Sequence, residues 1–226
     1  MEDARTTGRW YLVIAMGRSA GHLALGMAVS GGASCCIIPE EYAGKGLSLA
    51  GFCEVVETVV DANRRGGKQY GVVVIAEGVG ELLKDELAER FAANPLVAVE
   101  RDEFNNVRLA ELPLGLVIKR ELQDRAKQRG EKVTLVDVTV GYELRCADPI
   151  PFDVEYTHAL GWGAVEYLCD QQHVDWPAQG ALISLQEGKL CPIAFPHIMD
   201  LRTGKTSVRR VDLQSDQFRS TKALMG

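Results

Sequence analysis

YLVIAMGRSAGHLALGMAVSGGA, residues 11–33, is the stretch of sequence that decides the fold. Its apolar run ends abruptly at Met16-Gly17-Arg18, and the residues that follow have the apolar spacing of a helix. Arg18 therefore lies between a strand and the N-terminus of a helix, where backbone N–H groups attract anions. A guanidinium there adds a clamp for a phosphate, and Gly17 allows a close approach of the backbone. A turn with a solvated arginine is the alternative interpretation.

Strand-like and helix-like segments alternate along the rest of the chain. The alternation predicts the α/β class, with a mainly parallel sheet covered by helices on both faces. Ligands of such sheets lie at the carboxyl ends of the strands. We expect strands at 10–15, 33–38, 70–78 and 132–142, helices at 20–30, 47–65, 81–91, 113–129 and 154–172, a loop or insertion at 93–112, a hairpin at 181–195 turned at Glu187-Gly188, and a polar tail from 199 to 226.

The bulk composition limits the classes of function. The chain has 226 residues, enough for one sizeable core, with 46% hydrophobic and 25% charged residues as in ordinary globular domains. Its net charge of −6 argues against nucleic-acid binding, which needs a basic face, but allows a small anionic ligand. No apolar run approaches the ~20 residues of a membrane span, so we expect no membrane partner.

The six cysteines predict a reducing compartment. None of them forms a C-x-x-C pair, their spacing matches no zinc motif, and Cys35-Cys36 lie in an apolar run that suits buried thiols. The polar N-terminus MEDARTTGR does not resemble a signal peptide. We therefore expect a cytoplasmic protein.

Two further strand ends carry side chains suited to a sugar phosphate. Glu77 directly follows an apolar strand, where an unpaired carboxylate is costly. It suits the hydroxyl donors of a sugar or, alternatively, a salt bridge or a helix cap. Tyr142 and Arg145 lie three residues apart and can both reach one phosphate. Pro149 and Pro151 stiffen the segment after them, although a plain surface loop is the alternative.

The remaining polar candidates are better explained by structural roles. His22 and His158 lie in helical segments among apolar residues, which favours packing or capping over catalysis. His173 and His197 have no Cys or acidic partner at ligand spacing. The adjacent acids Glu40-Glu41 suit either a metal-bound water or a helix cap, and we favour a local structural role.

Three of these strand ends, in this order, resemble the phosphofructokinase family. AMGRSAGHLAL (15–25) is similar to the Met-Gly-Arg segment of that family, and VVVIAEGVGE (72–81) is similar to its strand end with a sugar-binding Glu. VTVGYELRCADPIPFDVEYTHALGWGAV (138–165) resembles the late phosphate-binding segment. Its Gly-Tyr-Glu-x-Arg-Cys form, followed by Asp153 and Tyr156, is typical of the pyrophosphate-dependent branch.

The resemblance implies a role for each matching residue. Met16, Gly17 and Arg18 would cradle the sugar phosphate, and Glu77 would hydrogen-bond the sugar hydroxyls. Tyr142 and Arg145 would bind the 6-phosphate near a subunit interface. The implied reaction is 6-phosphofructokinase activity in glycolysis on fructose 6-phosphate, with Mg²⁺ and either pyrophosphate or ATP as phosphoryl donor, in a homo-oligomer.

Two segments of the family have no counterpart in this sequence. We find neither its Gly-Gly-Asp-Gly donor loop nor its Thr-Ile-Asp-Asn-Asp-like segment, which carries the general base. The stretch Thr58-Val-Val-Asp61-Ala-Asn63 is superficially similar to the second segment, but it falls inside an expected helix. We therefore expect the C-terminal half of the enzyme, with no catalytic base or metal ligand of its own. About 10–170 would form the fructose 6-phosphate-binding sheet and helices. About 175–226 would form a hairpin and tail that pack on a donor domain, which a partner chain would supply.

Three functional hypotheses stay open on these grounds. The chain is the substrate-binding half of a phosphofructokinase, a non-catalytic sugar-phosphate-binding or regulatory protein, or an inactive piece that lacks the donor site. Acceptor binding alone cannot supply phosphoryl transfer, which needs a positioned donor, Mg²⁺ and a group that deprotonates the sugar hydroxyl.

Overall fold

The computed structural model describes residues 1–17, 19–92, 113–144, 146–169, 176–177, 180–200 and 203–225. These residues form two compact units, of which the first joins Met1–Arg145 to Arg209–Gly226 and the second is Cys146–Val208. The segment from Arg209 on packs with the first unit. The subdivision expected at about 170–175, with a tail that packs on a donor domain, stays a prediction. The loop or insertion expected over 93–112 lies outside the described residues.

The first unit is built on a parallel sheet with the strand order β2-β3-β1-β4. The central strand β1 (Trp10–Ala15) pairs on one side with β3 (Gly71–Ala76) and on the other with β4 (Leu135–Val140), and β2 (Cys35–Ile37) extends the sheet beyond β3. All pairings are parallel among the strands of this sheet. The four predicted strands and the parallel arrangement are therefore confirmed.

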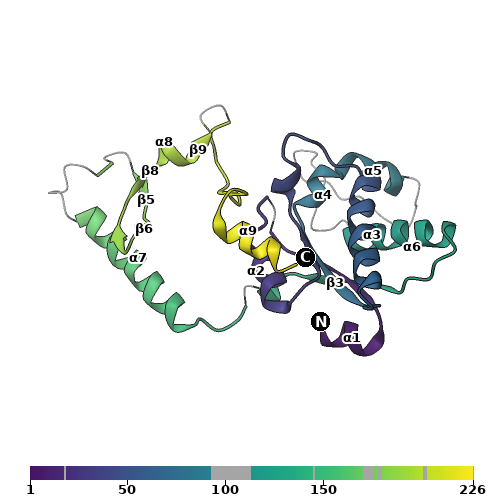
Figure 1. Ribbon diagram of the computed structural model, residues 1–226. Coiled ribbons are helices and arrows are strands. Elements are labelled where there is room, and N and C mark those ends of the chain that lie inside the picture. The colour runs from purple at the N-terminus through teal and green to yellow at the C-terminus, as the bar shows by residue number, and fades with distance from the viewer. Residues whose placement is uncertain are drawn as a thin grey trace. The chain divides into compact units, whose positions relative to one another are not determined.

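Helices cover both faces of this sheet, as the sequence predicted. Figure 1 shows α2 (His22–Gly31) on one side of the sheet, and α3 (Leu49–Arg65) and α6 (Leu114–Gln128) on the other. Alternate residues of each strand point to opposite faces. In β3, Val73 and Ile75 therefore join the core under α3 and α6, whereas Val74 and Ala76 join the core under α2.

The two faces of the sheet are packed with side chains of different size. The face under α3 and α6 buries large residues such as Phe52, Leu12 and Ile118, all 0% exposed. The face under α2 is rich in alanine, including Ala24 and Ala28. Fully burying a large apolar side chain stabilises the fold by about 1.5–3 kcal/mol. The face under α3 and α6 is therefore the main source of apolar stabilisation in the first unit.

The ends of α3 follow the expected sequence signals. Ser48 caps its start, where the side-chain oxygen accepts a hydrogen bond from the Gly51 N–H at 3.0 Å. Arg64 and Arg65 lie in its last turn, and Gly67 follows with a φ of 80°, which a residue with a side chain rarely adopts. The charged stretch predicted as one helix over 81–91 is instead divided between α4 (Val79–Leu82) and α5 (Lys84–Ala92).

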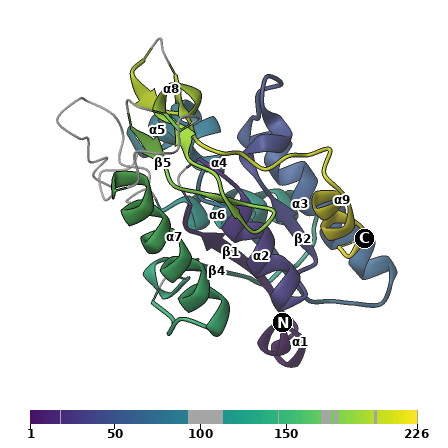
Figure 2. The same cartoon turned by 90° about the vertical axis from the view of Figure 1, so that its left-hand side faces the viewer.

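The C-terminal tail holds an element that the sequence analysis missed. Helix α9 (Asp216–Ala223) follows Ser215, whose side chain accepts a hydrogen bond from the Phe218 N–H at 3.2 Å. Lys222 of this helix donates to the Cys36 carbonyl at 2.9 Å and forms an ion pair with Glu41 at 2.8 Å. Figure 2 shows α9 beside β2 and α2 within the first unit. The Ser-Asp pair at 215–216 was the available helix-start signal.

The adjacent thiols Cys35 and Cys36 lie in β2. Cys36 is fully buried and Cys35 is partly buried. Burial is the main cause that raises the pKa of the Cys36 thiol to about 12. The thiol is therefore protonated near neutral pH, as expected of a structural, unreactive cysteine.

The described part of the second unit contains one long helix, one short helix and several short strands. Helix α7 (Pro151–Cys169) begins at Pro151, three residues before the predicted start, because proline suits the first turn of a helix. The predicted hairpin is confirmed: β6 (Leu185–Gln186) pairs with β7 (Lys189–Leu190), and the turn has φ 51° at Glu187 and φ 76° at Gly188. The other elements are β5 (Ala181–Leu182), β8 (Ile193–Ala194), α8 (Phe195–Ile198), β9 (Met199–Asp200) and β10 (Lys205–Thr206).

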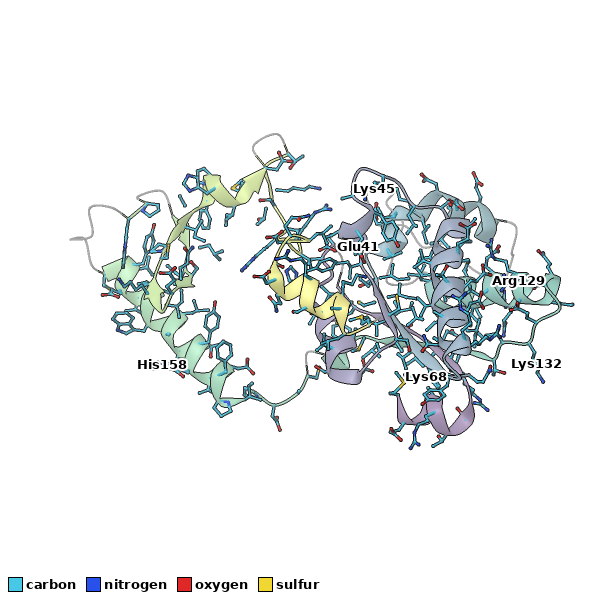
Figure 3. The ribbon with its side chains drawn as sticks, viewed as in Figure 1. Glu41, Lys45, Lys68, Arg129, Lys132 and His158 are labelled. Atoms are coloured by element: carbon cyan, nitrogen blue, oxygen red, sulfur yellow. The ribbon has the colours of Figure 1, made fainter. Side chains whose placement is uncertain are left out.

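An ion-pair network joins α3 to the carboxyl end of α6. The Glu57 carboxylate accepts two hydrogen bonds from Arg125 at 3.0 Å and one from Arg129 at 2.6 Å, and its side chain is only 14% exposed. Figure 3 labels Arg129 at this end of α6. Burial alone raises the pKa of Glu57, but the hydrogen bonds from Arg125 and Arg129 outweigh it, so the pKa lies below its ordinary value.

The lowered pKa of Glu57 makes a prediction about stability against pH. A carboxyl group whose pKa falls on folding stabilises the protein above its unfolded pKa, and this contribution is lost as the pH falls through the folded pKa. We expect Glu57→Gln to lower the free energy of unfolding by about 1–3 kcal/mol near pH 7, and the deficit to shrink as the pH falls below about 4. Urea unfolding at several pH values measures both. Glu54→Gln is the matched control, because Glu54 is 69% exposed and 3.8 Å from Arg125. Equal effects of the two substitutions would contradict the prediction.

Candidate functional site

The carboxyl edge of the parallel sheet brings three predicted segments together. Ala15, the last residue of β1, is in register with Ala76 of β3 and with Val140 of β4. The Met16 N–H donates to the Val140 carbonyl at 3.1 Å, and the Glu77 N–H donates to the Ala15 carbonyl at 2.9 Å. The chain therefore leaves the sheet at the same level after all three strands.

The two predicted sugar-phosphate segments are in direct contact. The Gly17 N–H donates a hydrogen bond to Oε2 of Glu77 at 3.0 Å, across the ends of β1 and β3. Gly17 has a φ of 142°, which glycine tolerates far better than other residues. A carboxylate has about four acceptor positions, so this bond leaves Glu77 able to accept from further donors. The contact fixes the carboxylate beside the segment that leads toward α2.

The chain connections diverge at this same point. The connection after β1 leads to α2 on one face of the sheet, whereas the long connection after β3 leads to α6 on the opposite face. Ligands of open α/β sheets bind where neighbouring connections diverge in this way. The Gly17–Glu77 contact lies between those two strands.

The third predicted segment forms a short turn after β4. Tyr142 begins the 3₁₀ turn Tyr142–Leu144 and is 74% exposed. Glu143 shapes this turn, because its carboxylate accepts the Gly141 N–H at 2.8 Å. Arg18 and Arg145, the two predicted phosphate clamps, lie outside the described residues. The structure thus brings together Met16, Gly17, Glu77 and Tyr142 at one edge without describing either arginine.

Glu40 has a larger structural role than the sequence suggested. It lies in the 3₁₀ turn Pro39–Tyr42 and is 5% exposed. Its Oε1 accepts the N–H of Gly21, just before α2, and the N–H of Val211 in the C-terminal segment, both at 3.0 Å. Its Oε2 is buried without a hydrogen-bond partner in the described structure. Glu40 therefore has a structural role, as the sequence analysis favoured, and its hydrogen bond joins it to Val211, 171 residues later in the chain.

No metal centre emerges from the residues that the structure describes. His22 begins α2, His158 lies on α7 and His197 lies on α8, whereas His173 is outside the described residues. The described residues contain no group of three His, Cys, Asp or Glu side chains that could hold a metal ion. We assign Mg²⁺ to none of the described residues. Among these same residues, no helix is long and apolar enough to cross a membrane.

Comparisons with known proteins show the family of the chain. Residues 1–168 match the phosphofructokinase family. The chain belongs to the phosphofructokinase family. This confirms the resemblance drawn from the three strand ends, all of which lie inside the matched residues.

Relatives of this phosphofructokinase-family chain include pyrophosphate-dependent enzymes. It is 43% identical over 225 residues to the pyrophosphate–fructose 6-phosphate 1-phosphotransferase of Thermotoga maritima, covering 100% of this chain and 52% of the relative. It is 38% identical to the enzyme of the same name from Naegleria fowleri, covering 100% of this chain and 51% of the relative. The chain therefore spans about half the length of these relatives.

Solved phosphofructokinases share the fold. The yeast enzyme from Saccharomyces cerevisiae superposes with a TM-score of 0.54 at 19% identity, over 85% of this chain and 20% of that one. The Pichia pastoris enzyme gives a TM-score of 0.52 at 23% identity, over 82% of this chain and 17% of that one. The predicted fold class is thus supported by both the sheet and its structural neighbours.

The close contact at Gly17 gives a prediction for this edge of the sheet. A Cβ at Gly17 would lie 3.2 Å from the Ala20 carbonyl oxygen, on a backbone with positive φ. We expect Gly17→Ala to lower the free energy of unfolding by about 1–3 kcal/mol, because the strained backbone weakens its bond to Glu77. Chemical denaturation measures the change. Gly31→Ala is the control, since a Cβ there meets nothing within 4 Å, and it should be neutral or stabilising. A Gly17→Ala protein as stable as the wild type would contradict the prediction.

Proposed function

We propose that the carboxyl edge of β1, β3 and β4 binds fructose 6-phosphate in a pyrophosphate-dependent 6-phosphofructokinase. Met16, Gly17 and Arg18 are proposed to cradle the sugar phosphate, and Glu77 to accept hydrogen bonds from the sugar hydroxyls. Tyr142 and Arg145 are proposed to bind the 6-phosphate. The substrate and the donor in this proposal come from the names of the Thermotoga maritima and Naegleria fowleri relatives.

The observation that carries the proposal is the 3.0 Å hydrogen bond between the Gly17 N–H and Glu77. It fixes a carboxylate, which accepts hydrogen bonds from hydroxyl groups, beside the backbone segment proposed to take the phosphate. A sugar phosphate carries both kinds of group on one small molecule. The contact also lies at the divergence of chain connections where such sheets bind ligands.

The role proposed for this chain is to bind and orient the acceptor. Holding the sugar hydroxyl in line with a donor lowers the entropic part of the barrier, because phosphoryl transfer depends mainly on positioning and charge stabilisation. Pyrophosphate is the proposed donor, with ATP as the alternative, and Mg²⁺ would neutralise charge on the donor when bound. No described residue is assigned to the donor, the metal or the general base. Glycolysis and a cytoplasmic location stay predictions.

A second candidate function is sugar-phosphate binding without turnover. The observation that favours it is the Gly17–Glu77 hydrogen bond itself, because both of its residues are proposed to bind the sugar phosphate and neither is proposed to act on a phosphoryl donor. An assay for fructose 1,6-bisphosphate formed from fructose 6-phosphate and pyrophosphate separates the two. Turnover favours the phosphofructokinase, and saturable binding without turnover favours the binding protein.

The first experiment on the proposed site is calorimetric titration of the chain with fructose 6-phosphate. We expect saturable binding that Arg18→Ala, Arg145→Ala and Glu77→Gln each weaken. Losing a hydrogen bond to a charged group costs about 1.5–3 kcal/mol, which is more than tenfold in affinity. Arg65→Ala, an exposed change in the last turn of α3, is the control and should leave the affinity unchanged. Unaltered affinity in all three site variants, or no binding by the folded chain, would contradict the proposal.

Helix α7 is the proposed contact surface for a partner. Most of its residues are exposed, and among them Phe152, Trp162 and Leu168 are 65%, 58% and 77% exposed. Several large apolar side chains exposed on one helix mark an interaction surface. We propose that its partner is a polypeptide with the part of the phosphofructokinase fold that this chain does not match, about half of the Thermotoga maritima relative.

Mixing experiments test the partner proposal. We expect the unmatched part of the Thermotoga maritima relative to form a one-to-one complex with this chain in light scattering after size exclusion. Trp162→Arg together with Leu168→Arg should abolish the complex by placing charges in an apolar contact. Val208→Arg, at a 52% exposed residue outside α7, is the control. A complex that survives the double substitution, or self-association with no mixed complex, would contradict the proposal.

A further inference from the structure

The first unit has a hollow whose lining includes neither Gly17 nor Glu77. It is a groove of about 510 Å³ between α2 and the C-terminal segment 209–221. Its volume is within the range of small-molecule sites, about 300–1,000 Å³. One wall carries Leu25, Val29 and Ser30 of α2, and the other carries Arg209, Arg210 and Phe218. We call it the α2–α9 groove.

The α2–α9 groove combines a cationic end with few competing acids. Arg209 and Arg210 both line it, and neither guanidinium has an ion pair or hydrogen bond with another described residue. His22, the first residue of α2, lines it as well. The acid among the lining residues is Asp212, and its Oδ1 already accepts the Gln214 N–H at 2.8 Å. Two arginines with no carboxylate partner in the described part of the chain are suited to bidentate binding of a phosphate.

The groove also has an apolar wall. Val29 is 43% exposed, and Phe218 lines the groove while it packs against the core under α2. One side of the Phe218 ring faces the Lys222 ammonium, 5.8 Å from the ring centroid. A partly buried aromatic ring near a pair of arginines is complementary to a ligand with an apolar group and a phosphate.

We propose that the α2–α9 groove binds a small phosphorylated molecule with an apolar or aromatic portion. Arg209 and Arg210 hold the phosphate, and Val29 and Phe218 pack on the apolar portion. None of these four residues belongs to the proposed fructose 6-phosphate site. The inference therefore does not rest on the proposed function.

Glu40 connects the groove to the start of α2. Its Oε1 accepts the N–H of Val211, directly after the two arginines, and the N–H of Gly21, directly before α2, both at 3.0 Å. A Cβ at Gly21 would lie 2.4 Å from Ile38, so this junction is tightly packed. A ligand that holds the C-terminal segment against α2 is expected to stabilise this junction by mass action. The same junction follows the Met16-Gly17 segment by only a few residues.

The test uses the whole chain and phenyl phosphate, which carries both a phosphate and an aromatic ring. We expect calorimetry to show that phenyl phosphate binds more tightly than inorganic phosphate, and that uncharged phenol does not bind measurably. Arg209→Gln with Arg210→Gln should lower the affinity for phenyl phosphate at least about tenfold, since two charged contacts are lost. Val29→Ser should lower the affinity for phenyl phosphate while leaving the affinity for inorganic phosphate unchanged.

The matched control removes two positive charges elsewhere. Arg65→Gln with Lys68→Gln changes the net charge equally at two exposed residues, the last residue of α3 and one between α3 and β3, and it should leave phenyl phosphate binding unchanged. Figure 3 labels Lys68 beyond the amino ends of the strands. Equal weakening by the two double variants would overturn the proposal. So would the absence of saturable binding up to ~10 mM phenyl phosphate in a chain whose cooperative melt shows that it is folded.

Competition experiments identify the source of the ligand. A nucleotide, AMP, and a sugar phosphate, fructose 6-phosphate, are each titrated against bound phenyl phosphate. Displacement by AMP assigns a nucleotide to the groove, and displacement by fructose 6-phosphate assigns a sugar phosphate. If fructose 6-phosphate binds undiminished in the Arg209→Gln/Arg210→Gln variant without displacing phenyl phosphate, the two sites are separate. A result that contradicts ligand binding in the α2–α9 groove can therefore be distinguished from a result that contradicts the proposed fructose 6-phosphate site.

Discussion

The parallel pairing of β1 with strands on both sides is the constraint on which the first unit depends. Because β1 is hydrogen-bonded to β3 and to β4 in one register, the ends of the three strands are at the same level. Residues separated by more than 120 positions in the chain, from Met16 to Gly141, therefore meet at one edge. A shift of one residue in either pairing would turn the side chains of that strand to the opposite face and separate these ends.

The two faces of the sheet have different roles: one supplies most of the apolar stabilisation, and the other positions the proposed binding segment. The face under α3 and α6 contains the large apolar side chains, and the Glu57–Arg125–Arg129 network joins those two helices at their edge. The alanine-rich face allows α2 to lie close to the sheet, directly after the segment that bonds to Glu77. Packing on the face under α3 and α6 thus stabilises the sheet, and packing on the alanine-rich face positions the start of α2.

The C-terminal segment completes the second face of the sheet. Val211, Leu213 and Phe218 pack on the core under α2, and Lys222 joins β2 through the Cys36 carbonyl and Glu41. Glu40 adds a buried junction between this segment and the start of α2. The groove between α2 and α9 exists because these contacts hold the segment beside the helix while leaving Arg209 and Arg210 exposed.

The sequence by itself determined the strands, most helices, the helices on both faces and the family, because these depend on local periodicity and on short motifs at strand ends. It pointed to Glu77 and Gly17 as site residues, and the structure brought them within 3.0 Å. Only the tertiary structure decided that the tail belongs to the first unit, that Glu40 joins Gly21 to Val211, and that a groove opens beside α2. The physical reason is that these features consist of contacts between residues far apart in the chain. A polar tail or a Pro-Glu-Glu turn has no periodicity that reveals its distant partner, so hydrogen-bond geometry and burial in the folded chain decide it.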